Sequence, residues 1–222
     1  MRQLSLPPAP SASAQNGTAP DGRKVNAAST QAALRAAGRK LFGHLGYEAT
    51  SLGAICTEAG VTTGALYHHF GDKKGLFAAV AEELDEGMVK LIAAARTQAL
   101  TGGADAWQAL MAAIDVFLQA GLNPERRRIG LTDAPAVLGA HVWLEIRERH
   151  GLGAMVQTVR TLQSLGMLPA GDVLLRARLI LGLLYGAVEA LAHQPEDAAQ
   201  SALAETRALV HAMLNGMRQP LP

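Results

Sequence analysis

Apolar residues recur along most of this 222-residue chain at intervals of three and four, the spacing that gathers side chains on one face of an α-helix. One such stripe predicts a first helix over residues 30–44. Another follows Asp72, a residue suited to cap a helix, and ends at the pair Gly102-Gly103. A period of two, which would indicate strands, is missing, and no segment repeats another. The sequence therefore predicts an all-α fold.

Residues 50–76 carry the densest set of helix boundary signals. Thr50 is expected to cap one short helix and Thr62 the next, because their hydroxyls can accept from free backbone N–H groups. Gly60 lies between the two helices. A residue without Cβ adopts the left-handed conformation at little cost, so Gly60 is expected to end the first helix. The pattern predicts two short helices joined by a tight turn, followed by the long helix at Asp72.

The second short helix has an apolar side and a polar side. Leu66 and Phe70 lie four residues apart and are expected to face inward. Thr63, Tyr67 and His68 fall on the opposite side. A helix-turn-helix needs this division, because its second helix presents hydroxyls and rings to phosphates and base edges. The stretch therefore predicts a DNA-binding helix-turn-helix.

Further apolar stripes predict helices throughout the rest of the chain. They lie over residues 107–118, a short segment at 126–128, residues 133–150 with Asp133 or Thr132 as the cap, and residues 152–162, 179–192 and 203–217. The Arg126–Arg128 run is expected to be a solvated face. Residues 179–192 are apolar nearly all round, which predicts burial on several sides. This stretch is too short to cross a bilayer, which takes about 20 residues, so no membrane segment is expected.

Composition and charge agree with a helical protein that binds a polyanion. The chain is 49% hydrophobic but only 4% aromatic, which favours helices over sheets. Residues 1–76 hold eight Lys and Arg against four Asp and Glu, a net +4, so the remainder carries −3 of the chain's total of +1. Positive charge therefore collects where DNA would dock. The single cysteine, Cys56, excludes an internal disulfide and fits a reducing cytosol.

Residues 1–28 are dominated by Pro, Ser, Ala and Gly and contain no apolar run. A signal peptide needs a continuous apolar core, so none is expected here. The composition predicts a disordered N-terminal extension. Arg23-Lys24 at its end offers an arm for phosphates or a minor groove, although a solvated tail is the simpler interpretation.

Residues 41–77 resemble the DNA-binding domain of the tetracycline-repressor (TetR) family of transcriptional regulators. The matching positions are Leu41-Phe42, Gly46-Tyr47, Thr50, Ala59-Gly60-Val61, Gly64-Ala65-Leu66-Tyr67, His69-Phe70, Lys73 and Leu76. One departure is Lys74, where the family usually has an acid. The resemblance implies a three-helix DNA-binding domain over residues 29–75 and an effector-binding and dimerisation domain over residues 76–222.

The resemblance also implies which residues contact DNA. These are Thr50, Thr62, Thr63, Gly64, Tyr67, His68 and Lys73. Tyr67 and Lys73 are expected to bind phosphates with help from Thr50, while Thr63, Gly64 and His68 are expected to meet base edges. The pair His68-His69 is not expected to bind metal, because neighbouring side chains on a helix point about 100° apart.

An effector pocket is expected between the helices of the larger domain. Its candidate lining is Trp107, Met111, Phe117, His141, Trp143, Met155, Tyr185 and Glu189. For each of these residues the alternative is an ordinary core position. Glu189 lies inside an apolar run and needs a partner. Arg176 or Arg178, in the same chain or across a dimer, is favoured over a hydrogen bond to a ligand. The mostly apolar lining predicts a hydrophobic or aromatic effector.

The sequence as a whole predicts a ligand-responsive repressor, cytoplasmic and nucleoid-associated, that binds a palindromic operator. A homodimer formed through the last two helices is implied by the family and suits two half-sites. No cofactor is expected. The alternatives are a helical adaptor without an effector and a cofactor-free enzyme. For an enzyme the sequence offers no nucleophile–base pair, since Cys56 lies in the DNA-binding part and the histidines are scattered.

Overall fold

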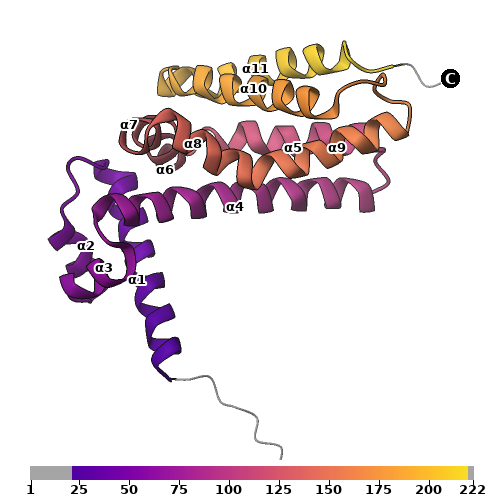
Figure 1. Ribbon diagram of the computed structural model, residues 1–222. Helices are drawn as coiled ribbons and strands as arrows, with labels where there is room; N and C mark the ends of the chain where they lie inside the picture. The colour runs from indigo at the N-terminus through magenta and orange to yellow at the C-terminus, as the bar shows by residue number, and fades with distance from the viewer. Residues whose placement is uncertain (1–21, 220–222) are drawn as a thin grey trace, which may run out of the picture.

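The computed structural model describes residues 22–219, and within that range every regular element is helical. Figure 1 shows a small head at the N-terminal end and a larger helical bundle beyond it, joined by the long helix α4. The prediction of an all-α fold is confirmed. Within the same residues, no helix combines the length and the apolarity needed to cross a bilayer.

The head consists of α1 (Gly22–Leu45), α2 (Leu52–Ala59), α3 (Thr63–Phe70) and the start of α4. Leu34 of α1 and Leu66 of α3 are fully buried in its core. The predicted turn is present: Gly60 has φ 66° and ψ 31°, and its N–H donates to the carbonyls of the last turn of α2. A side chain would strain that left-handed backbone, which explains the glycine.

The cap of α2 differs from the prediction. Ser51, not Thr50, is the N-cap, and its hydroxyl accepts from the N–H of Ala54 at 3.1 Å. Thr50 is buried, and its own hydroxyl donates to the carbonyl of Gly46 at 2.7 Å. Two adjacent hydroxyl residues suit the same role in sequence, and only the turn geometry selects between them. Thr62 caps α3 as predicted, accepting from Ala65 N at 3.2 Å.

Helix α1 begins eight residues before the predicted start at Thr30. The added segment contains Ala27 and Ala28, and alanine is the strongest helix former. Thr30 bonds inside the helix by donating to the carbonyl of Asn26 at 2.9 Å. Residues 22–28, expected in the disordered extension, are therefore helical. The rest of that predicted extension, residues 1–21, lies outside the described residues.

Helix α4 (Lys73–Thr101) carries the chain from the head into the bundle. The carboxylate of Asp72 caps it by accepting from Gly75 N at 2.7 Å, and Gly102 ends it, both as predicted. Helix α5 (Ala106–Ala120) then returns along α4.

The segment after α5 is more broken than the sequence predicts. It comprises α6 (Pro124–Arg126), the π-helical η1 (Arg127–Asp133), α7 (Ala134–Leu138), α8 (Ala140–Arg147), the π-helical η2 (Glu148–Leu152) and α9 (Gly153–Ser164). A single helix over residues 133–150 was wrong because Gly139, with φ 91°, separates α7 from α8. Asp133 stands at the N-cap position of α7 but makes no capping hydrogen bond with its side chain, because its carboxylate accepts from the N–H of Tyr47 at 2.8 Å.

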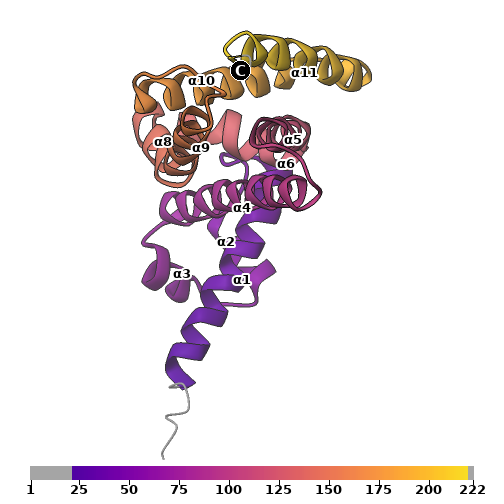
Figure 2. The same cartoon turned by 90° about the vertical axis from the view of Figure 1, so that its right-hand side faces the viewer.

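The chain ends in α10 (Val173–Ala192), the short η3 (Glu196–Ala198) and α11 (Ala199–Asn215). Figures 1 and 2 show the bundle as three layers, with α4 on one side, α5 and α9 in the middle, and α10 with α11 on the other side. Within one chain the apolar helix α10 is buried on one side only. Leu179 is 64% exposed, so the expected burial on several sides is not met inside a single chain.

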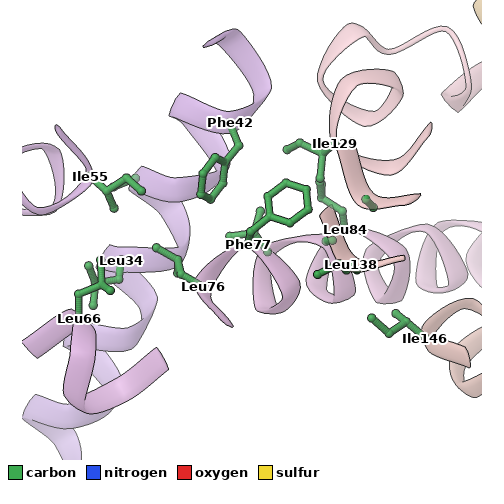
Figure 3. Close-up of a cluster of buried hydrophobic side chains, with 14 of the residues drawn as sticks. Leu34, Phe42, Ile55, Leu66, Leu76, Phe77, Leu84, Ile129, Leu138 and Ile146 are labelled. Atoms are coloured by element: carbon green, nitrogen blue, oxygen red, sulfur yellow. The ribbon is translucent and has the colours of Figure 1, made fainter. Parts of the chain in front are cut away.

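Buried side chains form two cores. One fills the bundle around residues such as Trp107 and Leu162. The other joins the head to the bundle, because Phe42 of α1 and Phe77 of α4 pack with Ile129 of η1 (Figure 3). The rings of Phe42 and Phe77 meet edge to face, with centroids 5.1 Å apart.

Phe77 is expected to be essential for this joint core. Its side chain is fully buried, so Phe77→Ala should lower the free energy of unfolding by about 3–5 kcal/mol. Urea denaturation followed by circular dichroism measures the change. Leu91→Ala is the matched control, since Leu91 lies on the same helix but is 47% exposed. A loss below about 1 kcal/mol for Phe77→Ala would contradict the packing described above.

Candidate DNA-binding face and ligand cavity

The exposed side of α3 gathers five of the seven predicted DNA-contacting residues. These are Thr62, Thr63, Gly64, Tyr67 and His68, all solvent-exposed. Tyr67 is 52% exposed, while Leu66 next to it is fully buried and holds the helix against the head. Phe70 is partly buried in the same core, as predicted. The helix thus presents hydroxyls, an imidazole and a phenol on one accessible surface.

Thr50 does not belong to that surface. Only 1% of the residue is exposed, and its hydroxyl is engaged with Gly46 O. The hydroxyl proton of Thr50 is therefore not free for the predicted phosphate contact. Ser51, which is exposed, occupies the N-cap position instead.

Lys73 fastens the start of α4 to the turn between α1 and α2. Its ammonium donates to the carbonyls of Tyr47 at 2.9 Å and Thr50 at 3.0 Å, and lies 4.1 Å from the centroid of the Tyr47 ring. An ammonium has three protons, so one is left for a phosphate. The main role of Lys73 is therefore structural. Lys74 beside it is exposed.

The two histidines of α3 have different surroundings. His69 Nδ1 lies 3.4 Å from the amide nitrogen of Gln31 on α1, whereas His68 is exposed. Within the described part of the chain, no group of three or more His, Cys, Asp or Glu side chains is placed to hold a metal ion.

A cavity lies inside the bundle as two adjoining hollows that share lining residues, among them Asp85 and Met88 of α4, Phe117 of α5 and Tyr185 of α10. One hollow reaches toward η1 and α8, where Arg126, Arg127, Trp143 and Arg147 line it. The other extends between α4, α5, α9 and α10 and is lined mostly by apolar side chains. The volume of the cavity there is about 120 Å³.

Four of the eight predicted effector residues line this cavity: Phe117, Trp143, Met155 and Tyr185. The Phe117 and Tyr185 rings lie 6.0 Å apart at 61°. The guanidinium carbon of Arg147 lies 3.3 Å from the centroid of the Tyr185 ring, and burial lowers the pKa of Arg147. An aromatic wall with a cation stacked on it therefore forms one side of the cavity.

The other four predicted residues lie elsewhere. Trp107 is a core residue whose Nε1 donates to Asn215 at 2.8 Å, and Met111 packs against the same core. The side chain of His141 is 85% exposed, and Glu189 is exposed as well. Helical periodicity identifies a buried side of a helix but not whether that side meets a void or another side chain.

Two expectations about arginines also fail. Within one chain Glu189 does not pair with Arg176 or Arg178, because Arg178 binds Glu148 at 3.0 Å and Arg176 donates to the carbonyls of Pro169 and Ala170. The run Arg126–Arg128 is not a uniformly solvated face. Arg126 donates to Leu84 O at 3.0 Å and Arg127 to Ala192 O, and only Arg128 is exposed.

Asp85 is one of the cavity residues that were not predicted. It lines both hollows, and its Oδ2 is buried with no hydrogen-bond partner among residues 22–219. Burial raises the pKa of Asp85 to about 6, opposed in part by the charges of Arg147, His150 and Arg126. The sequence contains a signal for it. Asp85 is the one acid on the stripe formed with Ala81, Met88 and Val89, where a charge is costly.

Comparison with known proteins assigns the chain to a family. The family model for bacterial regulatory proteins of the tetR family matches residues 34–80, which form the head. The model for the tetracyclin repressor-like C-terminal domain matches residues 107–217, half of the chain. This protein belongs to the TetR family. It is a DNA-binding transcriptional regulator and not an enzyme, as predicted.

Several similar proteins agree with the assignment of this chain to the TetR family. A TetR-family regulator from Pectobacterium atrosepticum is 34% identical, with a TM-score of 0.75, over 90% of this chain and 99% of that one. The TetC protein of transposon Tn10 from Escherichia coli is 31% identical over 57% of this chain, which spans 60% of TetC. RolR, solved with the ligand resorcinol, shares the fold at 20% identity and a TM-score of 0.63, over 90% of this chain and 98% of RolR.

The buried carboxylate should make the stability of this TetR-family protein depend on pH. Burial raises the pKa of Asp85 from its ordinary value of 3.8 to about 6 in the folded state, so the folded state binds more protons between these pH values. The contribution of Asp85 therefore becomes less favourable as pH rises from about 4 to 6. Asp85→Asn, which does not titrate there, should be more stable than the parent at pH 7, by up to about 3 kcal/mol.

Urea unfolding at pH 4 and pH 7 tests this expectation. The gain from Asp85→Asn should be present at pH 7 and shrink toward pH 4. Glu86→Gln is the control on the same helix. Glu86 pairs with the exposed Lys90 at 2.7 Å. An Asp85→Asn variant that is less stable than the parent at pH 7 would show that the carboxylate is well paired.

Proposed function

We propose that this regulator is a repressor that binds a palindromic operator as a homodimer and is released by a small hydrophobic or aromatic effector. The observation that carries the proposal is the exposed polar side of α3, held by buried Leu66 on a head that also presents Lys74. Tyr67 and the free proton of Lys73 suit phosphate oxygens, while Thr63, Gly64 and His68 suit base edges. The family's regulators bind DNA as dimers.

An apolar surface on the last two helices supports dimerisation there. Large apolar side chains that are 38–64% exposed on α10, on α11 and just after it are Leu174, Leu175, Leu179, Leu209, Met213 and Met217. On α10, Gly182 and Gly186 have open space where a Cβ would stand, so another helix could approach closely. A monomer seldom exposes such a group of side chains without a partner.

The segment from α6 to η1 supplies a physical link between the cavity and the head. Arg126 and Arg127 line the cavity. On the other side of the same segment, Glu125 accepts both guanidinium bonds of Arg39 on α1, at 2.8 and 2.7 Å. Asp133 accepts from Tyr47 N. A ligand that displaces this segment would turn the head, and two heads must match major grooves about 34–36 Å apart.

The character of the cavity supports a small effector with an aromatic or apolar body. Its lining combines the rings of Phe117, Trp143 and Tyr185 with the thioethers of Met88 and Met155. RolR, which has the same fold, binds the single-ring compound resorcinol. By linkage, effector and operator would weaken each other's binding by the same factor.

Tyr67 is the sharpest test of the DNA-binding face. Tyr67→Ala should weaken operator binding by at least about a hundredfold, because both heads of a dimer lose a phosphate contact. A mobility-shift titration with DNA from upstream of the chain's own gene measures it, and gel filtration checks that size is unchanged. Arg160→Ala, an exposed position on α9, is the control. Unchanged binding by Tyr67→Ala would refute the assignment of the recognition helix.

Leu179 tests the proposed dimer. Leu179→Asp places a charge on the apolar surface of α10 and should convert the dimer to monomer, with loss of operator affinity. Light scattering after gel filtration gives the mass. The matched control is Leu91→Asp on α4, which forms the opposite layer of the bundle (Figure 2). Dissociation by the control and not by Leu179→Asp would place the interface elsewhere.

A further inference from the structure

Two buried polar atoms belong to cavity-lining side chains and lack a partner among the residues that the structure describes. They are Oδ2 of Asp85 and Nε1 of Trp143. Trp143 is only 6% exposed, so bulk water has little access to its indole. Buried polar groups in native proteins are nearly always hydrogen-bonded, and an exception calls for an explanation. Both residues line the same hollow, which points to a ligand that supplies the missing partners.

The two atoms need opposite partners. Oδ2 of Asp85 needs a donor, and the indole N–H of Trp143 needs an acceptor. A carboxylate would accept from Trp143 but would bring a second negative charge to Asp85. An ammonium would donate to Asp85 but offers no acceptor, and it would face Arg126 and Arg147 in the same hollow. A neutral hydroxyl group donates one hydrogen bond and accepts others, so it meets both needs.

The walls indicate what carries that hydroxyl. The residues that line both hollows together with Asp85 are Phe117, Tyr185 and Met88, two aromatic rings and a thioether. Aromatic rings and thioether sulfur both favour the faces and edges of an aromatic ring. Arg147 stacks on Tyr185 in the same wall. The lining therefore favours an aromatic ring as the group that carries the hydroxyl.

We propose that the effector is a neutral phenol, with one or two hydroxyls, that donates a hydrogen bond to Asp85 and accepts one from Trp143. The inference rests on the proposed function in taking this cavity as the effector site. Asp85 then selects for the hydroxyl, and Trp143 selects for its oxygen. A methyl ether of the same ring lacks the donor, and a charged ring compound lacks one of the two matches.

The indole N–H signals offer a direct test, because the full chain contains only two tryptophans. In protein labelled with ¹⁵N, each gives one indole signal, assigned with the Trp143→Phe variant. Phenol should shift the signal of Trp143 and saturate. The signal of Trp107 is an internal reference, since its N–H is already bonded to Asn215 at 2.8 Å and lies in the other core.

Four one-ring probes then separate the chemistries: phenol, anisole, benzoate and benzylamine. Phenol should bind at least about tenfold more tightly than anisole, with the two charged probes weaker still. Asp85→Leu, close in shape but without an acceptor, should weaken phenol about tenfold and change anisole less than twofold. Asp85→Asn retains an acceptor, so its affinity for phenol should lie between that of the parent and that of Asp85→Leu. Glu86→Gln should bind phenol as the parent does.

The outcomes distinguish this inference from the proposed function. Phenol that fails to shift Trp143, or benzoate or benzylamine that binds more tightly, overturns the phenol assignment while leaving operator binding untouched. Equal affinities of phenol and anisole overturn it as well. Phenol that shifts Trp143 and depends on Asp85, yet never weakens operator binding, supports the ligand chemistry and contradicts effector release.

Discussion

The burial of Phe77 against Phe42 and Ile129 is the packing on which the rest of the molecule depends. Phe77 lies on α4, Phe42 in the head and Ile129 in η1, so one close-packed cluster joins three parts of the chain. Such interiors do not deform continuously; they move as units or change between discrete packings. The head and the segment around η1 must therefore respond together to any change in the bundle.

Polar contacts around this cluster fix the orientation of the head relative to the bundle. Lys73 ties α4 to the turn that precedes α2, and Asp133 ties η1 to the same turn through Tyr47 N. Glu125 and Arg39 form a third link on the surface. Each of the three joins backbone or side chains that are distant in sequence. The head is thus held from both α4 and η1, which are also two walls of the cavity.

The head was largely predictable because its signals are local. Thr62, Gly60 and Asp72 act within a few residues of where they stand, and the family pattern covers them. The error at Thr50 arose where two adjacent residues suit one role. The cavity depends on which helices meet, and η1 and Gly139 break the chain where a periodic pattern suggests continuity. Core and cavity residues have the same hydrophobic pattern, so half of the proposed lining was misplaced.

The carboxylate of Asp85, whose Oδ2 has no hydrogen-bond partner among residues 22–219, has a consequence for how such a regulator evolves. A ligand that completes a costly buried group gains binding energy that an already satisfied site cannot offer. Sensitivity to the signal and tolerance of heat would then be opposed at one position. Under the proposed function, populations selected for heat resistance without the effector would accumulate replacements at Asp85, and the regulator would then stay on its operator when the effector returned.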